Sequence, residues 1–402
     1  MKIAFIGSLP AAAVLPAEYI REKHRGGHHP APWIAALLPA LAKASGFRLR
    51  VILIQRAILR HCIVELDGVE YEGIPYHLPE RLGFKTLHLA KSIQARRALK
   101  SFQPDLVHAF GMETGSATIA LRSGFPVSCF IQGMWEFLAP YFSGCPWGDI
   151  AAARWSESRA VRQINWFVAE NEFARGWALE RNPAAKVVII PHPLRQDFLD
   201  KAAPTYHKQI ISVGGLNGHK GMDTVIRAFS HVQRSDCRLC IVGSGPLEMS
   251  LRRLVDSLGL DNQVEFAGTL DTDNVIERMN ASTALAIGSR MDTSPNVISE
   301  AHAIGLPVVG TRAGGIPEMI DEGIDGHVVE VDDDVAMGRW LEQLLAAPEN
   351  CRKLGESGRE KVRLLNSPTA AAQAHVEFFH GIQEDIRRCN YNNKQKHSFN
   401  NR

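Results

Sequence analysis

The sequence is poor in cysteine, has no long apolar run and carries almost no net charge. Seven cysteines in 402 residues are a sparse and odd number, which argues against a disulfide framework and for a reducing compartment. No segment approaches the roughly 18 uninterrupted apolar residues of a membrane-spanning helix. A formal net charge of +2 argues against a protein built to bind nucleic acid. We therefore expect a cytoplasmic globular protein, and its length predicts two or three domains.

The near-neutral total hides an uneven distribution of charge. Residues 1–190 carry 22 basic and 15 acidic side chains, a net of +7, and residues 191–402 carry 23 and 28, a net of −5. The basic excess gathers in residues 81–104, where Leu87, Ala90, Ile93 and Leu99 interleave with it at near-helical spacing. This pattern is typical of an amphipathic helix on an anionic membrane surface, although a core-facing helix with a solvated basic face has the same pattern.

Apolar runs of strand length alternate with segments of helix length along the whole chain. We expect strands over residues 2–6, 49–54, 106–109, 127–132, 166–168, 187–190, 210–213, 238–242, 264–267, 284–287, 307–310 and 327–330. Such alternation predicts an α/β protein with parallel sheets covered by helices. The length fits two doubly wound, Rossmann-like domains that face each other across a cleft. In such sheets ligands bind at the carboxyl ends of the strands.

Breaks in the alternation suggest the domain boundaries. Prolines at positions 191, 193 and 204 interrupt any regular element, so we expect a linker over residues 191–208. It would join an N-terminal domain (1–190) to a C-terminal domain (209–370). A helix over residues 371–388 would pack back toward the N-terminal domain. Residues 389–402 are polar and rich in Asn, and they are predicted to be disordered.

Two glycine-containing turns follow predicted strands of the second half. The first, "GGLNGHKGMD", contains Gly214, Gly215, Gly218 and Gly221, which allow close backbone approach to a ligand. Its Lys220 lies where the next helix begins, and its charge adds to the positive end of the helix dipole. A diphosphate is the expected ligand, and a glycine-rich turn with a solvated lysine is the alternative. The second turn contains Gly243, whose backbone could face a base or a ribose.

A third motif, "DTSPNVISEA", follows the predicted strand 284–287. We expect a helix over about residues 295–304, with Ser294 as its N-cap and Pro295 at its first position. The amides of Asn296 and Val297 would then form an anion site. Two carboxylates flank this helix start: Asp292 could accept hydrogen bonds from sugar hydroxyls, and Glu300 could reach a ribose. Taken separately, each is more often a surface residue.

The three motifs together resemble the retaining nucleotide-sugar glycosyltransferases of family 4, which have the two-domain GT-B fold. The resemblance covers nearly the whole chain and is strongest over about residues 210–330. It implies that Glu300 holds the donor ribose, Asp292 faces the donor sugar and Lys220 contacts the diphosphate, which makes these three the predicted catalytic residues. It further implies donor contacts from the glycine turns and from the loop Thr293, Ser294, Pro295, Asn296 and Val297.

The chain departs from the family pattern at three positions. The family often has Arg in place of Gly215, Glu in place of Asp292 and His in place of Gln132. Arg290 or Arg312 could supply the missing charge, and Gln132 can still hydrogen-bond a sugar although it cannot carry a proton.

The first half also matches the family in a loop that precedes its first long helix. Gly26 and Gly27 correspond to a Gly-Gly loop that would contact the donor. No cofactor is expected, and the motifs require no metal. The nearby histidines 24, 28 and 29 lack a matched carboxylate or cysteine to complete a ligand set.

The expected function is transfer of a sugar from a nucleotide-diphosphate sugar to a hydroxyl acceptor with retention of anomeric configuration. The resemblance implies a glycan or lipid-linked acceptor, a role in polysaccharide or glycolipid synthesis, and a protein in the cytoplasm or peripheral on the inner membrane face. Residues 81–104 would provide an anionic-membrane surface. Two alternatives stay open: a GT-B nucleotide-sugar epimerase, and a nucleotide-sugar-binding protein without turnover.

Overall fold

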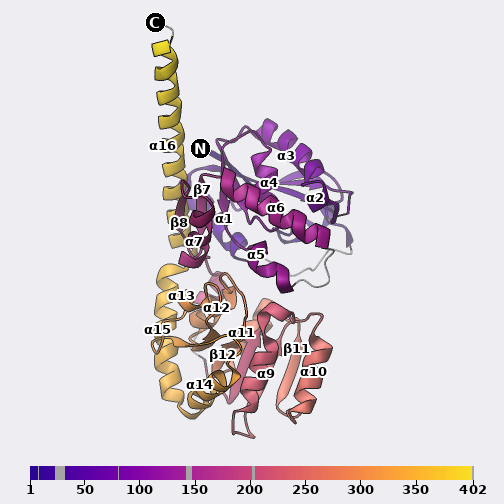
Figure 1. Ribbon diagram of the computed structural model, residues 1–402, viewed down its shortest axis with the longest axis vertical. Coiled ribbons are helices and arrows are strands. Elements are labelled where there is room, and N and C mark those ends of the chain that lie inside the picture. Colours follow the sequence, from indigo (N-terminus) through magenta and orange to yellow (C-terminus); the bar gives the residue numbers. More distant parts are fainter. Residues whose placement is uncertain (8, 23–31, 80, 142–146, 202–203, 401–402) are drawn as a thin grey trace.

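The computed structural model describes residues 1–402 except 8, 23–31, 80, 142–146, 202–203 and 401–402. It has two α/β domains, one above the other in Figure 1, each built on its own sheet. Each of the twelve expected strand ranges overlaps a strand of the structure, which confirms the predicted fold class. The first domain uses strands up to Ile189, and the second begins its sheet at Gln209.

The first domain contains an eight-stranded sheet in the order β3-β4-β2-β1-β5-β6-β7-β8. Its strands are β1 (Lys2–Ile6), β2 (Arg48–Gln55), β3 (Cys62–Leu66), β4 (Val69–Pro75), β5 (Leu106–Phe110), β6 (Val127–Phe130), β7 (Trp166–Ala169) and β8 (Lys186–Ile189). All neighbouring pairs are parallel except β3 and β4. Side chains alternate between the two faces, so Ile3 and Phe5 pack toward α1 and α16 while Ala4 and Ile6 pack toward α3, α4, α6 and α7.

The antiparallel hairpin of β3 and β4 was not among the expected strands. Its turn is Asp67-Gly68, and both residues have positive φ, 51° and 77°. An Asp-Gly pair between two strand-like runs is a strong hairpin signal, because this tight turn needs positive φ at both central positions. The hairpin makes β3 one edge strand of the sheet. The other edge strand is β8, which precedes the linker to the second domain.

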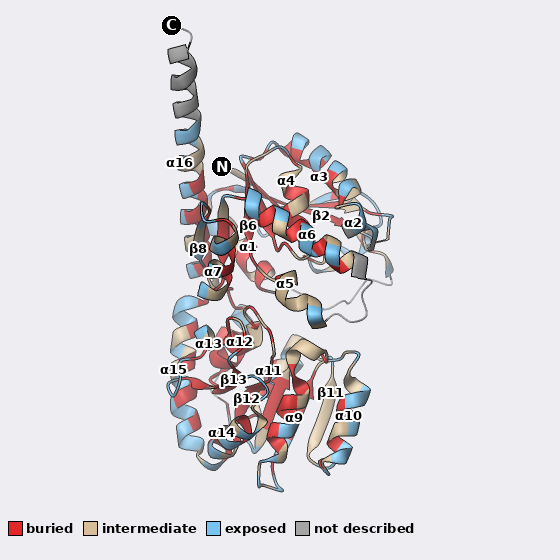
Figure 2. Ribbon diagram, viewed as in Figure 1, coloured by how far each residue is buried: buried red, intermediate tan, exposed pale blue. Residues whose placement is uncertain are grey.

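The second domain contains a fully parallel six-stranded sheet in the order β11-β10-β9-β12-β13-β14. Its strands are β9 (Gln209–Val213), β10 (Arg238–Val242), β11 (Val264–Gly268), β12 (Ala284–Ile287), β13 (Val308–Thr311) and β14 (Gly326–Val329). Helices cover both faces: α9, α10 and α14 lie on one side and α8, α11, α12 and α13 on the other. Figure 2 shows the inner strands of this sheet buried between helices with exposed outer faces, while the edge strand β11 is only partly buried.

The helices have the following bounds. They are α1 (Pro32–Ser45), α2 (Arg81–Lys85), α3 (Leu89–Phe102), α4 (Ser116–Leu121), α5 (Trp135–Leu138), α6 (Trp147–Gln163), α7 (Glu172–Arg181), α8 (Gln196–Leu199), α9 (Met222–Ser230), α10 (Glu248–Ser257), α11 (Thr272–Asn280), α12 (Asn296–Ile304), α13 (Ile316–Met319), α14 (Asp334–Ala346), α15 (Pro348–Leu365) and α16 (Pro368–Asn400).

The last helix returns from the second domain to the first. Its residues Ala372, Phe379 and Ile382 are buried in the core of the first domain, beside α1. Figure 1 shows α16 running along that domain and projecting past it. The structure continues this helix through residues 389–400, for which we predicted disorder. Residues after Gly381 include no glycine or proline, the two residue types that most strongly disfavour a helix. The helix that packs on the first domain can therefore continue along the chain.

Candidate active site

The glycine turns of the second domain interlock at the carboxyl ends of its strands. Gly243 has φ +135°, and a Cβ there would lie 2.0 Å from the carbonyl oxygen of Gly214. Gly314 has φ +56°, and its Cβ would lie 2.0 Å from the carbonyl oxygen of Asp292. Neither position can carry a side chain without moving a neighbouring loop. The loops after β9, β10, β12 and β13 therefore form one packed edge that faces the first domain.

Two of the three predicted catalytic residues are in direct contact. Nζ of Lys220 lies 2.6 Å from Oδ2 of Asp292, and both side chains are partly buried. The aliphatic stem of Lys220 runs over Gly214, whose Cβ position is 3.7 Å from Cδ of the lysine. Gly218, Lys220 and the residue between them form a short 3-10 turn before α9 begins at Met222. The lysine is thus held above the glycine turn, and its charge is balanced by one carboxylate.

The loop from Thr293 to Val297 joins the pair to helix α12. Pro295, with extended backbone, is the N-cap, and α12 begins at Asn296. The prediction that Ser294 caps this helix was wrong: its hydroxyl lies 3.6 Å from Sδ of Met319, because the proline ring fixes the turn one residue later. The amides of Asn296 and Val297 precede the first helical bond, from Ile298 N to the carbonyl of Pro295 (3.0 Å).

Glu300 lies one turn into α12. Burial raises its pKa to about 7, and the positive charge of Arg195, in the segment between the domains, acts against that rise. A carboxyl group with this pKa exists in both protonation states near neutral pH, so it can accept or donate a hydrogen bond to a hydroxyl group.

The first domain contributes a polar cluster at the ends of β5 and β6. Gln132 follows β6, and its Oε1 lies 2.7 Å from the Cβ position of Gly111, beside the carboxylate of Glu113. Burial raises the pKa of Glu113 to about 7 and that of Glu157, which faces it, also to about 7. Sequence reasoning missed these two acids. Gly26 and Gly27 lie outside the described residues.

A joint between the domains was also missed. Asn171 caps α7 through its Oδ1, 3.0 Å from the amide of Ala174, and its Nδ2 donates to the carbonyl of Thr293 at 2.6 Å. The carboxylate of Glu318, from the second domain, accepts the amides of Glu172 (2.6 Å) and Phe173 (2.8 Å). A carboxylate at a helix N-terminus is favourable for the helix dipole. An Asn before a helical segment is a known capping signal, so the bond from Asn171 to the amide of Ala174 could have been predicted from the sequence. The bond from Asn171 to the carbonyl of Thr293 could not.

A second connection runs through His192, which is buried between the domains. Its Nδ1 lies 2.9 Å from Oδ1 of Asn296, and its Nε2 lies 2.9 Å from Oε1 of Glu170. The ring stacks on Trp33, with 4.0 Å between centroids and 17° between planes. The side chain of Asn296 therefore points toward the linker. We call Glu170, His192 and Asn296 the hinge relay.

Both arginines that could replace the missing charge at Gly215 are paired with carboxylates. Arg290 forms a bidentate pair with Asp223 (2.9 and 2.7 Å) and also contacts Asp332. These carboxylates raise the pKa of the Arg290 guanidinium. Arg312 pairs with Glu330 at 2.8 Å on the surface. Among the cations that the sequence suggested, Lys220 lies at the glycine turn after β9, and its contact with a diphosphate stays a prediction.

In the part of the chain that the structure describes, no cluster of three or more His, Cys, Asp or Glu side chains could hold a metal ion. Within the same residues, none of the helices combines the length and hydropathy of a membrane span.

Family models match most of the chain. A model of glycosyl transferases group 1 matches residues 195–361, and a glycosyl transferase 4-like domain matches residues 30–193. The two matches meet between the two sheets, and together they contain the glycine turns, the hinge relay and the Lys220–Asp292 pair. The chain belongs to the group 1 family of glycosyl transferases (family 4).

Two curated relatives match this chain, one over about half of its own length and the other over most of it. N-acetyl-α-D-glucosaminyl L-malate synthase of Bacillus anthracis is 32% identical over 44% of this chain, and the match spans only about half of that relative (47%). The lipopolysaccharide core biosynthesis glycosyltransferase LpsD of Rhizobium meliloti is 25% identical over 81% of this chain and 89% of its own length.

Solved structures share the fold of the whole chain. Sucrose-phosphate synthase from Thermosynechococcus elongatus has a TM-score of 0.78 at 19% identity, covering 96% of this chain and 100% of that chain. Anabaena HepE in complex with UDP-glucose has a TM-score of 0.71 at 15% identity, covering 95% and 100%. At these identities the likeness is one of fold.

Proposed function

We propose that this protein transfers a sugar from a nucleoside-diphosphate sugar to a hydroxyl acceptor, with retention of configuration. The second domain would bind the donor and the first domain the acceptor. The observation that carries this proposal is the Lys220–Asp292 pair (2.6 Å) next to the start of α12, because it combines a cation and helix amides at one anion site. HepE, a neighbour in fold, is described in complex with UDP and glucose.

Most of the predicted residues have a role in this reaction. The donor diphosphate would take Lys220 from Asp292, and the amides of Asn296 and Val297 would bind its oxygens. Asp292, once released, would accept hydrogen bonds from the donor sugar. Glu300 would bind the ribose, and Gln132 would contact the sugar from the first domain. Gly214, Gly215 and Gly243 would let the nucleotide approach the backbone, and donor contacts from Gly26 and Gly27 stay a prediction from the sequence.

The proposed step exchanges two bonds at the anomeric carbon. The bond from that carbon to the β-phosphate oxygen breaks, and the acceptor oxygen bonds to the same face. The acceptor proton passes to the departing phosphate, so no protein nucleophile or metal is needed. Positioning and stabilisation of the diphosphate would supply most of the catalysis.

The first test measures donor binding and turnover separately. Calorimetry with a panel of UDP- and GDP-sugars would identify the donor, and release of free nucleotide would report turnover. Lys220→Ala should reduce turnover by roughly 10²–10³-fold, as loss of one preorganised charge does. Lys208→Ala is the matched control, since Lys208 pairs with Asp236 on the surface at the opposite end of β9.

The same assay separates the alternatives. An epimerised sugar without transfer would identify an epimerase, and donor binding without turnover would identify a binding protein. Binding of no nucleotide sugar, or wild-type turnover in Lys220→Ala, would refute the proposal.

We further propose a glycan or lipid-linked acceptor and peripheral association with an anionic membrane through residues 81–104. Helix α3 buries Ala95, Leu99 and Phe102 in the core, while Leu89 and Ile93 are 54% and 48% exposed beside basic residues. An exposed face that is both basic and apolar supports a membrane surface over a simply solvated helix. Reversal of Lys91, Arg96 and Arg97 to Glu should abolish binding to anionic vesicles.

A further inference from the structure

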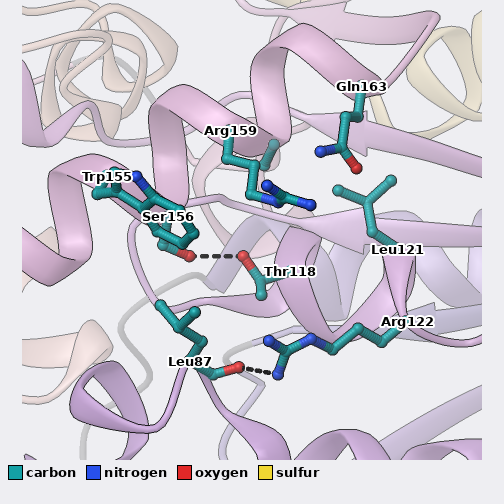
Figure 3. Close-up of a pocket in the computed structure, with 9 residues that line it drawn as sticks. Leu87, Thr118, Leu121, Arg122, Trp155, Ser156, Arg159 and Gln163 are labelled. Atoms are coloured by element: carbon teal, nitrogen blue, oxygen red, sulfur yellow. Dashed lines mark hydrogen bonds between the residues drawn. The ribbon is translucent and has the colours of Figure 1, made fainter.

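A hollow of about 420 Å³ lies on the outside of the first domain, away from the cleft. Figure 3 shows its walls: α4 and α6 on two sides, and the turn between α2 and α3 below. The lining residues are Leu87, Thr118, Leu121, Arg122, Trp155, Ser156, Arg159, Ala160 and Gln163. They combine two guanidinium groups with apolar side chains and contain no acidic residue. The hollow is thus a cationic and amphipathic site.

The two arginines differ in what holds them. Arg122 donates from Nη1 to the carbonyl of Leu87, which anchors it in the wall. The guanidinium carbon of Arg159 lies 5.6 Å from the centroid of the Trp155 ring, and no ion pair of Arg159 occurs among the described residues. A guanidinium beside an aromatic ring and without a carboxylate partner is suited to bind a phosphate oxygen.

The backbone at the floor of the hollow has a conformation that its surroundings hold in place. Leu87 and His88 are consecutive non-glycine residues with φ of 48° and 56°, a conformation that costs free energy and persists only where surroundings impose it. His88 is buried, and the hydroxyls of Thr118 and Ser156 join α4 to α6 at 2.6 Å. The walls are therefore held in place without a ligand.

The hollow continues into the proposed membrane surface. Leu87 lies two residues before the start of α3, whose exposed face bears Leu89, Ile93 and Arg96. On the other rim, the side chain of Trp155 is 51% exposed. A membrane in contact with α3 would therefore also cover the mouth of the hollow.

We propose that this hollow binds the phosphate headgroup of one anionic phospholipid. Arg159 and Arg122 bind the phosphate, Gln163 and Ser156 offer hydrogen bonds to the headgroup, and Trp155 and Leu87 contact the glycerol and first acyl carbons. A volume of about 420 Å³ is in the range of small-molecule sites. The proposal deepens the membrane association proposed above, and it is independent of the transfer reaction.

The test uses a short-chain phosphatidylglycerol kept below its micelle concentration, with calorimetry on the full chain. A hollow that binds one headgroup gives saturable binding of the monomeric lipid at a ratio of one, and Arg159→Gln weakens it by about tenfold or more. Arg162→Gln is the matched control: this arginine is exposed on the same helix and does not line the hollow. It should retain binding within about twofold.

Three further measurements distinguish a headgroup site from a diffuse charged surface and from a site for free phosphate. Trp155→Ala should weaken monomer binding without a change of charge, and sedimentation with phosphatidylglycerol vesicles should show a greater loss for Arg159→Gln than for Arg162→Gln. Equal losses in the two arginine variants, or no monomer binding, would mean a diffuse electrostatic surface and would overturn the proposal. Equal affinity for inorganic phosphate would overturn its lipid part. Donor calorimetry on the same variants reports separately on the transferase function.

Discussion

Replacement of His192 by Ala tests whether the hinge relay holds the donor loop in place. The imidazole bridges Glu170 of the first domain and Asn296 at the start of α12, 2.9 Å from each. In His192→Ala without donor, the loop that leads into α12 can move, so that water hydrates Glu170 and Asn296 in place of the imidazole. Donor binding then has to restore the ordered loop with Glu170 and Asn296 unpaired.

The structure sets the size of the expected effect. Oδ1 of Asn296 loses its hydrogen-bond partner on the buried His192 ring, and an acceptor left unpaired beside this buried position costs about 1–3 kcal/mol. At about 1.4 kcal/mol per tenfold, donor affinity should fall by about 5- to 150-fold. This free-energy cost lowers donor affinity because the protein without donor avoids it by letting the loop move.

The assay is donor calorimetry combined with thermal melting. Glu170→Gln and the double variant complete a cycle, and the double variant should lose no more donor affinity than His192→Ala alone. The control is His231→Ala, since His231 pairs with Asp334 at 2.8 Å on the surface of the second domain. An unchanged donor affinity in His192→Ala, with only a lower melting temperature, would refute the reasoning, as would additive losses in the cycle.

Three other perturbations follow from the structure. Gly314→Ala places a Cβ 2.0 Å from the carbonyl oxygen of Asp292, so its melting temperature and donor affinity should fall well below those of Gly124→Ala, which has φ +86° and open space; equal effects would contradict the clash. The pKa of about 7 for Glu113 lies above its ordinary value, so its contribution to stability is present at low pH and is lost as pH rises through 7. Thermal melting from pH 5.5 to 8 should therefore favour Glu113→Gln increasingly over wild type, and a constant difference would count against a raised pKa. Glu318→Ala removes the cross-domain cap of α7 and should cost about 1 kcal/mol in chemical unfolding, a loss that Glu277→Ala, exposed on α11, should not share.

Local patterns were enough to predict the fold and the main motifs. Period and length identified the strands, and the glycines before Met222 marked the turn at the end of β9. The hairpin of β3 and β4 was also readable, from Asp67-Gly68, but was missed. The tail over residues 389–400, for which its polarity predicted disorder, contains no glycine or proline and continues α16 in the structure.

The sequence by itself determined two parallel-sheet domains, the order of the donor motifs and the unequal charge of the two halves. These features depend on residues that are close together in the sequence, because the period of a strand and the conformation of a glycine turn are local properties. Only the tertiary structure decided that Lys220 faces Asp292, that Arg290 is occupied by Asp223, and that the side chain of Asn296 points to His192. Those contacts join residues 72, 67 and 104 positions apart. Local chemistry leaves such pairs open, because the folding of the whole chain brings them together.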